Sequence, residues 1–293
     1  MRFLVFILCF ATAVLGHMQL VYPAPFGADN NPHRTDPVDE FLQYPYNCCG
    51  RTTPFPCGGY LSLLGTPQGA PTASWEAGSE QNWTIAGIGN HYGGSCQVGF
   101  SVDKGKTFQV ATSYQGNCPH RNSGSGPEGQ AFKFTVPADI PTGGVVFAWT
   151  WFNREQEFNM NCAAVTITDS GAAGNVAVAP APTSAARLHA PLQPSSTYVT
   201  DGCTCTCDKP PAARAMLHHN RAGGVQIHHT PSKRDSSMPF HERPGLLIAD
   251  DGNGCLTPHT VAEVKYPHPG PEIVAGDGEY PLQLPTPADK CGY

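Results

Sequence analysis

Residues 144–168, GVVFAWTWFNREQEFNMNCAAVTIT, contain two strand signals close together. Residues 144–152 and 161–168 are rich in β-branched and aromatic residues, which favour β-strands. Trp149 and Trp151 lie two residues apart and therefore share one face of their strand, where we expect them to be packing residues. The stretch predicts two strands of a β-sheet.

Similar signals precede this stretch. The segment HMQLVYPAPFG at residues 17–27 has the alternating character of an opening strand, and Gly, Pro, Asn or Asp turns separate the later candidates. Those further strands are predicted at 81–88, 96–101, 108–113 and 130–136, with a hairpin turn at 103–106. Many short strands without an amphipathic helix predict an all-β fold: an antiparallel, immunoglobulin-like or fibronectin III-like β-sandwich with long loops.

Composition divides the rest of the chain. Residues 1–16 have a charged start and an apolar run, which is typical of a secretory signal peptide. Residues 17–169 form the predicted β-sandwich, in which the polar, Pro- and Cys-containing stretch 27–58 is a long loop. Residues 170–200 are Pro- and Ala-rich and predict a linker. Residues 201–293 predict a largely irregular, Cys- and His-containing C-terminal region.

The predicted location is extracellular. Twelve cysteines suit disulfides in an oxidising compartment, and Asn82-Trp83-Thr84 is a sequon for N-glycosylation. No apolar run after the signal approaches the roughly 20 residues that span a bilayer. The net charge of -6 lacks the basic footprint of a nucleic-acid-binding protein. We therefore expect a secreted monomer with no membrane span and no nucleic-acid partner.

His17 gains a chemical role if the signal is cleaved after Gly16. An N-terminal histidine can bind a metal through its free α-amino group and its imidazole together, and a second histidine then completes a site of three nitrogens. The candidate partner is His91, in the glycine-rich turn GNHYGGSCQ at residues 89–97. This turn precedes a predicted strand, and a disulfide at Cys96 would anchor it.

These residues resemble a known family. The start HMQLVYPAPFG, the turn NHYGGSCQ, the GNCP around Cys118 and the stretch AWTWFNREQEFNMNCAAVTIT occur in the order found in secreted fungal lytic polysaccharide monooxygenases. The resemblance is in particular to the chitin-active auxiliary-activity class eleven and to related secreted fungal proteins. It covers about residues 17–168.

The resemblance implies one copper ion per chain, held by a histidine brace. His17 would supply its amino and ring nitrogens and His91 a ring nitrogen, a donor set that suits copper. The family oxidises a carbon of the glycosidic bond in an insoluble polysaccharide such as chitin. It needs an external electron donor and dioxygen or hydrogen peroxide.

The residue beside the metal departs from the family pattern. The family places an aromatic residue, commonly tyrosine, on the axial side of copper. Counting back from Cys162 puts Asn159 at that position, whereas a local shift brings Phe158 inward instead. A slip of one residue reverses the faces of a strand, so only one of the two can point at the metal. Phe158 is preferred as the catalytic-site residue, with Asn159 as the alternative.

Other side chains are assigned by proximity in sequence. Glu155, Gln156 and Glu157 could orient a bound oxygen species. Tyr22, Phe26 and Tyr92 could stack on sugar rings of a substrate.

The function predicted is a secreted copper-dependent monooxygenase that cleaves chitin, or another β-linked polysaccharide. The alternative is a secreted histidine-brace protein that binds copper for acquisition, or for interaction with the cell wall, without oxidising a glycan.

Overall fold

The computed structural model describes residues 17–48, 50–169 and 238–293 of the 293-residue chain. The predicted signal peptide and linker, and the first part of the predicted C-terminal region, lie outside the described residues. The described helices are short: η1 Cys57–Leu63, η2 Pro67–Gly69, η3 Phe240–Glu242 and α1 Ala288–Cys291. The strands are β1 Met18–Tyr22, β2 Ala73–Glu76, β3 Glu80–Gly87, β4 Ser95–Ser101, β5 Gln109–Gln115, β6 Ala131–Thr135, β7 Gly143–Phe152, β8 Phe158–Thr168, β9 Glu263–Val264, β10 Glu272–Ala275 and β11 Leu282–Gln283.

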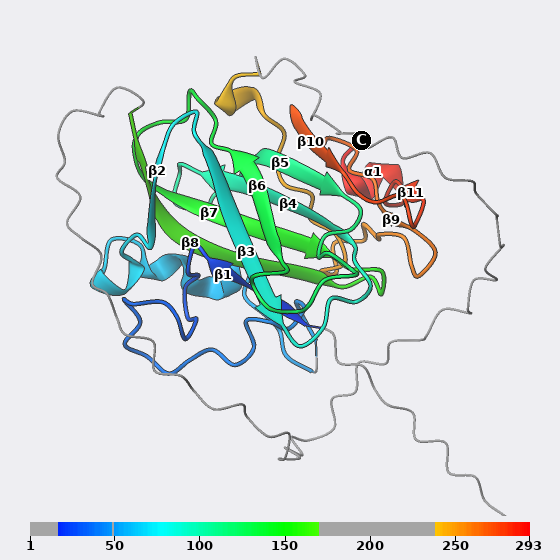
Figure 1. The fold of residues 1–293 in the computed structure, drawn as a ribbon, viewed down its shortest axis with the longest axis horizontal. Helices are drawn as coiled ribbons and strands as arrows, with labels where there is room; N and C mark the ends of the chain where they lie inside the picture. The colour runs from blue at the N-terminus through cyan, green and yellow to red at the C-terminus, as the bar shows by residue number, and fades with distance from the viewer. Residues whose placement is uncertain (1–16, 49, 170–237) are drawn as a thin grey trace, which may run out of the picture.

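Two sheets form a β-sandwich, which confirms the predicted fold class. One sheet has the order β1-β3-β6 and the other β10-β5-β4-β7-β8-β2 (Figure 1). Neighbouring strands are antiparallel except at the two edges of the larger sheet, where β10 pairs with β5 and β2 with β8 in parallel. The sequence did not predict these two short edge strands.

The main core fills the space between the sheets. Trp83 of β3 stacks on Phe132 of β6 at 4.4 Å between ring centroids, and both face the larger sheet. From the larger sheet, Trp149 and Trp151 are fully buried in the same cluster. The prediction that these two tryptophans are packing residues is therefore confirmed.

A second apolar cluster covers the outer face of the larger sheet. Alternate residues of β7 and β8 point into it, among them Phe152 and Phe158. Partners come from the long loop and η1, such as Tyr46, and from the C-terminal part of the chain, such as Tyr266. Because both faces of this sheet are covered, β7 and β8 are buried along almost their whole length.

Residues 238–293, called here the C-terminal segment, contain little regular structure and pack against the sandwich. Strand β10 extends the larger sheet, and Figure 1 shows the segment, orange to red, beside β5. Arg243 is buried and donates to the carbonyl oxygens of Val110 and Ala111 in β5. The linker-like composition before the segment does not reveal this packing.

Three disulfides are present among the described residues. Cys57–Cys162 fastens η1 to β8, Cys96–Cys118 joins the start of β4 to the loop after β5, and Cys255–Cys291 closes the C-terminal segment. The second bond anchors the turn that precedes β4, as proposed for Cys96.

The predictions of no membrane span and of a glycosylation site concern the helices and the protein surface. Within the described ranges, no helix is both long and apolar enough to cross a membrane. Asn82 of the sequon is exposed on β3. Its glycosylation stays a prediction.

Candidate metal centre

His17 immediately precedes β1 and is almost fully buried. Its carbonyl oxygen accepts a hydrogen bond from the Ile88 amide at 2.9 Å, which ties it to the end of β3. The His17 ring lies 4.4 Å from the Tyr44 ring and 5.8 Å from the His91 ring, between centroids. The structure therefore brings together the two histidines that the sequence suggested as a pair.

Gly87 makes room for His17 where β1 and β3 pair. A Cβ at Gly87 would overlap the carbonyl oxygen of His17, so Gly87→Ala must push the two strands apart. We expect the free energy of unfolding to fall by about 1–3 kcal/mol, as overpacking does elsewhere. Urea denaturation measures this. The matched control is Gly144→Ala in β7, whose added Cβ meets no described atom within 4 Å. The control should stay within about 0.5 kcal/mol; an equal loss in both variants would contradict the steric argument.

The turn that carries His91 has a left-handed backbone. φ is positive at four consecutive residues, from 44° at His91 to 120° at Gly94. A Cβ at Gly94 would lie 2.7 Å from the indole nitrogen of Trp151 and would overlap a carbonyl oxygen of β7. That indole donates to the carbonyl oxygen of Gly93 at 3.1 Å. Glycine is thus required for the turn to lie against β7, where the rings of His91 and Trp151 are 5.7 Å apart.

Asn90 holds the same turn from the other side. Its side chain donates to the carbonyl oxygens of His120 and Arg121, at 3.0 and 3.1 Å. It also accepts from the Tyr92 amide at 3.1 Å. These bonds fix the His91 turn to the loop after β5, which the Cys96–Cys118 disulfide already joins to β4.

The two histidines fit a metal ion. Neither ring nitrogen of His17 has a hydrogen-bond partner within the described part of the chain, although both are buried. Burial, reinforced by the neighbouring His91, lowers the pKa of His17 to about 4, so the ring is neutral at mildly acidic pH and can donate a lone pair. An ion bound to one nitrogen of each ring would lie about 3 Å from each centroid. The centroid separation of 5.8 Å admits one such ion.

The donor set is small. In the described part of the chain, no three His, Cys, Asp or Glu side chains form a group that could hold a metal ion. A histidine brace needs only two side chains, because its third nitrogen is the α-amino group of the first residue. The pair His17 and His91 therefore matches the side-chain requirement of a brace.

Two carboxylates face His91. Glu155 Oε2 lies 3.2 Å from Nδ1 of His91, and Glu157 Oε2 lies 3.6 Å from Nε2. Asn153 shapes their turn between β7 and β8, because its Oδ1 accepts from the amides of both glutamates at 3.0 and 3.1 Å. The structure places two of the three predicted polar neighbours beside the histidine.

Gln156, the third predicted neighbour, points elsewhere. Its φ is 60°, and its side-chain amide donates to the carbonyl oxygen of Thr257 in the C-terminal segment. Sequence proximity alone grouped it with the two acids. The side chain of Gln156 therefore binds the C-terminal segment and does not join the two acids beside His91.

The axial prediction also needs correction. Register pairs Phe152 with Phe158 and Trp151 with Asn159, and paired residues share a face of the sheet. Phe158 is buried in the outer cluster, stacked on Phe152 at 5.2 Å. Phe158 therefore does not point toward the histidines, because no local shift reverses the strand.

Asn159 lies on the face that holds the histidines. It is opposite Trp151, whose ring contacts His91, and it is buried. Neither its amide nitrogen nor its amide oxygen has a hydrogen-bond partner among the described residues. An unbonded buried amide is costly, so the geometry favours Asn159 as the residue beside a metal.

Comparison with known proteins identifies a relative that is aligned with this chain over most of the relative's length. The AA11 family lytic polysaccharide monooxygenase A of Aspergillus fumigatus is 37% identical over 161 residues, which cover 54% of this chain and 68% of that protein. The chain belongs to the AA11 family of lytic polysaccharide monooxygenases. An AA11 enzyme of Aspergillus oryzae is 33% identical over 175 residues, 55% of this chain and 37% of the relative. The enzyme class is copper-dependent polysaccharide monooxygenase.

Family models and solved structures do not add to this family assignment. No family model matches the sequence. The solved structure titled "Structure of T.fusca AA10A" aligns with 52% of this chain and all of its own chain, at 13% identity and a TM-score of 0.30. The fold assignment rests on the strands themselves.

The aromatic residues expected at the substrate surface of this lytic polysaccharide monooxygenase separate into three cases. Phe26 is buried in the outer cluster, so its prediction as a surface residue is wrong. Tyr22 ends β1, five residues from His17 and hence about 16 Å away; its hydroxyl accepts from the Trp75 indole at 3.2 Å. Tyr92 follows His91 and is 43% exposed. Only Tyr92 combines exposure with closeness to the centre.

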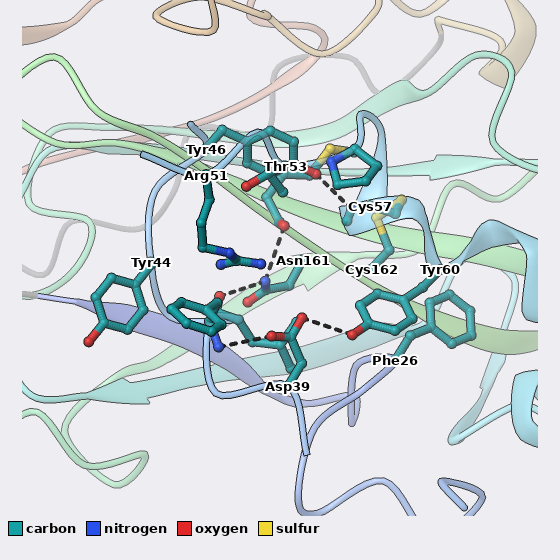
Figure 2. Close-up of a pocket in the computed structure, with 15 residues that line it drawn as sticks. Phe26, Asp39, Tyr44, Tyr46, Arg51, Thr53, Cys57, Tyr60, Asn161 and Cys162 are labelled. Carbon is teal, nitrogen blue, oxygen red and sulfur yellow. Dashed lines mark hydrogen bonds between the residues drawn. A yellow bond between two sulfur atoms is a disulfide. The ribbon is translucent and has the colours of Figure 1, made fainter. Parts of the chain in front are cut away.

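Tyr44 is the neighbour that sequence reasoning missed. Figure 2 shows its ring at the edge of a small pocket lined by the long loop and by Asn161 of β8. The pocket has a volume of about 40 Å³, which accommodates water but no sugar ring. Its polar groups support the loop: Asp39 accepts from the Tyr60 hydroxyl at 2.8 Å and from the Phe41 amide at 2.9 Å. The loop thereby presents Tyr44 to His17, and no pattern in the sequence signals this.

Proposed function

We propose that this enzyme is secreted and oxidatively cleaves chitin, or another β-linked polysaccharide, with one copper ion held by His17 and His91. The observation that carries the site is the pair of buried rings 5.8 Å apart, with both ring nitrogens of His17 left without a hydrogen bond among the described residues. The choice of chitin rests on the family resemblance. The third nitrogen requires cleavage after Gly16, which frees the α-amino group of His17.

Glu155 would set the orientation of the second histidine. Its negative charge, 3.2 Å from Nδ1, would favour a proton on that nitrogen, which leaves Nε2 with its lone pair for the metal. The buried Trp151 ring fixes the other side of the imidazole. Both interactions hold His91 before any ion arrives.

Bound copper supplies one-electron redox chemistry toward dioxygen or hydrogen peroxide, once an external donor has reduced it. Glu157, 3.6 Å from Nε2 of His91, is placed to hold or move a proton beside the ion. The exposed ring of Tyr92 next to the centre offers a face on which a sugar ring can stack. We expect a monomer that works on the surface of an insoluble polysaccharide.

Asn159 would lie beside the ion in this proposal, and its replacement gives a test that needs no substrate. Asn159→Leu removes two buried amide atoms that lack partners, so the metal-free protein should be as stable as the wild type or more stable. The Cu(II) electron paramagnetic resonance spectrum should change, because the group facing the ion has changed. Urea denaturation and the spectrum are the two measurements.

The matched control is Asn161→Leu on the same face of β8. Asn161 accepts from the Leu20 amide at 2.8 Å and donates to the Leu42 carbonyl oxygen at 2.9 Å. Its loss should lower the free energy of unfolding by about 1–3 kcal/mol. A comparable loss in Asn159→Leu, with an unchanged spectrum, would refute the placement of Asn159 beside the ion.

The function itself is tested with protein whose first residue is His17. The protein is loaded with copper and incubated with ascorbate and chitin, cellulose or a β-glucan, and the soluble products are analysed by mass spectrometry. Oxidised oligosaccharides from chitin are expected. Tight copper binding without oxidation of any of these glycans would favour the copper-binding alternative.

A further inference from the structure

The C-terminal segment contacts both loops that surround His91. One is the His91 turn between β3 and β4, and the other is the 153–157 turn that carries Glu155 and Glu157. Most contacts from the segment to these loops come from residues 257–280.

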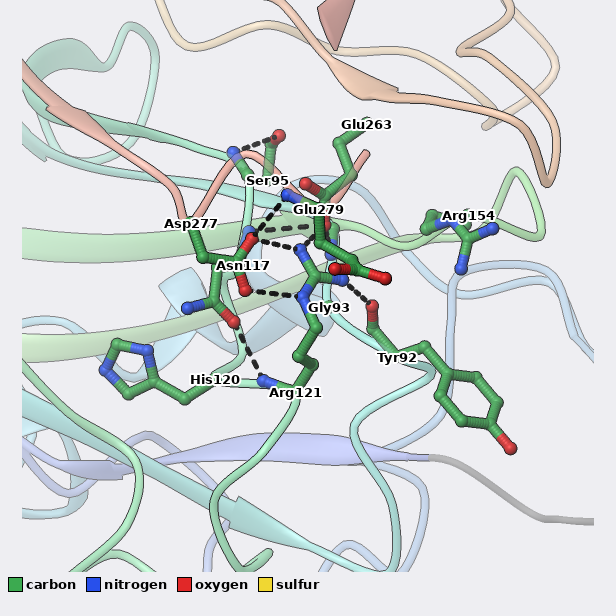
Figure 3. Close-up of polar contacts among 12 residues, drawn as sticks. Tyr92, Gly93, Ser95, Asn117, His120, Arg121, Arg154, Glu263, Asp277 and Glu279 are labelled. Atoms are coloured by element: carbon green, nitrogen blue, oxygen red, sulfur yellow. Dashed lines mark hydrogen bonds and ion pairs between the residues drawn. The ribbon is translucent and has the colours of Figure 1, made fainter. Parts of the chain in front are cut away.

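Glu263 of β9 makes the contact to the His91 turn (Figure 3). Its Oε1 accepts from the Gly94 amide at 2.9 Å, from the Asn117 amide at 3.2 Å and from the Arg121 guanidinium at 2.8 Å. Its side chain is 1% exposed. A carboxylate buried this deeply is stable only because charge-assisted hydrogen bonds replace its water.

Arg121 completes the network. It also donates to both carboxylate oxygens of Asp277, at 2.7 and 2.9 Å, and to the carbonyl oxygen of Tyr92, the residue after His91. Figure 3 shows the guanidinium between these acceptors. The C-terminal segment thus reaches the residue next to His91 through a single arginine.

The sandwich has a space shaped for the Glu263 carboxylate. A Cβ at Gly93 would lie 2.7 Å from Oε1, and a Cβ at Gly116 would lie 2.6 Å from Oε2. Both glycines have positive φ. Because Gly93 and Gly116 have no side chains, the two loops leave a recess in which the Glu263 carboxylate lies.

The C-terminal segment also contacts the 153–157 turn. The Thr260 amide donates to the Arg154 carbonyl oxygen at 2.6 Å, and the Arg154 guanidinium donates back to the Thr260 carbonyl oxygen. That guanidinium also lies 3.5 Å from the ring centroid of Tyr280. The turn that presents Glu155 and Glu157 to His91 is consequently fixed by the same segment.

We propose that the C-terminal segment positions the metal-binding histidine, with Glu263 as the positioning residue. Glu263 touches no metal ligand; it acts through Gly94 and Arg121 on the turn that carries His91. The inference rests on the proposed role of His91 in binding copper, but its main test is made on the metal-free protein.

The test compares Glu263→Gln with the wild type by NMR of the metal-free protein. Glutamine keeps the shape of the side chain and removes the charge that pairs with Arg121. We expect the ring signals of His91 to shift and the Gly94 and Asn117 amides to exchange faster with solvent. Copper affinity should fall roughly 10-fold. Loss of a group that orients a metal ligand weakens affinity by about 10–100-fold, and Glu263 acts only indirectly. Glu80→Gln, at an exposed ion pair with Lys133, is the control and should change none of these signals.

Unmoved His91 ring signals in Glu263→Gln would overturn the proposal, even if the variant is less stable. If Glu263→Gln does not fold, Asp277→Asn loosens Arg121 from its more exposed side and should move the same signals by a smaller amount; unmoved signals there would overturn the proposal too. A wild type that binds no copper while Glu263→Gln shifts the His91 ring would refute the copper site and support the positioning role.

Discussion

Replacing His91 with alanine in protein that begins at His17 is expected to abolish the tetragonal Cu(II) signal. The His91 ring is buried beside the His17 ring, and no other histidine ring contact of His17 is found among the described residues. Loss of groups that merely orient a ligand weakens metal affinity by 10–100-fold. Loss of the ligand itself should therefore reduce copper affinity by roughly 100-fold or more. Copper titration followed by electron paramagnetic resonance measures both quantities.

His241→Ala is the control for this experiment. His241 lies in η3, its side chain is 78% exposed, and it belongs to the C-terminal segment. Its removal should leave the copper spectrum and affinity unchanged. A normal spectrum in His91→Ala, or an equal loss in His241→Ala, would show that copper binds somewhere other than between His17 and His91.

The second large effect concerns stability. Replacing Cys57 and Cys162 together with alanine should lower the free energy of unfolding by about 2–5 kcal/mol. The bond closes a loop of 105 residues, so its removal raises the conformational entropy of the unfolded chain. It also lies in the outer cluster and fastens η1 to β8. Urea denaturation, with the midpoint and slope compared, gives the loss.

Loop length provides the comparison. The Cys255–Cys291 bond closes 36 residues, and chain entropy then predicts a loss about 1 kcal/mol smaller for its double alanine variant. The long loop presents Tyr44 to His17, so the Cys57/Cys162 variant should in addition perturb the His17 ring signals. Equal losses from the two pairs would argue that local packing, rather than chain entropy, dominates.

The strands could be predicted because their side chains alternate or cluster in a way that burial demands. Trp149 and Trp151 mark the inner face of β7 by spacing alone, and the predicted strand at 96–101 corresponds to β4. Strand β10 could not be found in this way. It has four residues, three of them exposed, and is a strand only because it pairs with β5.

The candidate site shows the same limit. His17 and His91 were suggested by local features, a cleavage site and a glycine-rich turn, which the sequence displays directly. The choice between Phe158 and Asn159 depended on the register of β8 against β7, and one residue of register exchanges the two faces. Glu263 lies 172 residues from His91 in the chain, and only the folded structure brings its carboxylate to the His91 turn.

The C-terminal segment covers part of the outer face of the larger sheet, and this determines which residues the folding unit must include. Composition changes near Ser170, and a chain ended there would resemble a complete β-sandwich in sequence. Yet such a chain would expose part of the apolar surface that includes Phe152, which the C-terminal segment covers with Tyr266. It would also lose the parallel partner of β5, so that β5 becomes the edge strand, and an exposed edge strand promotes association. The smallest autonomous form of this enzyme therefore includes residues on both sides of the compositional boundary.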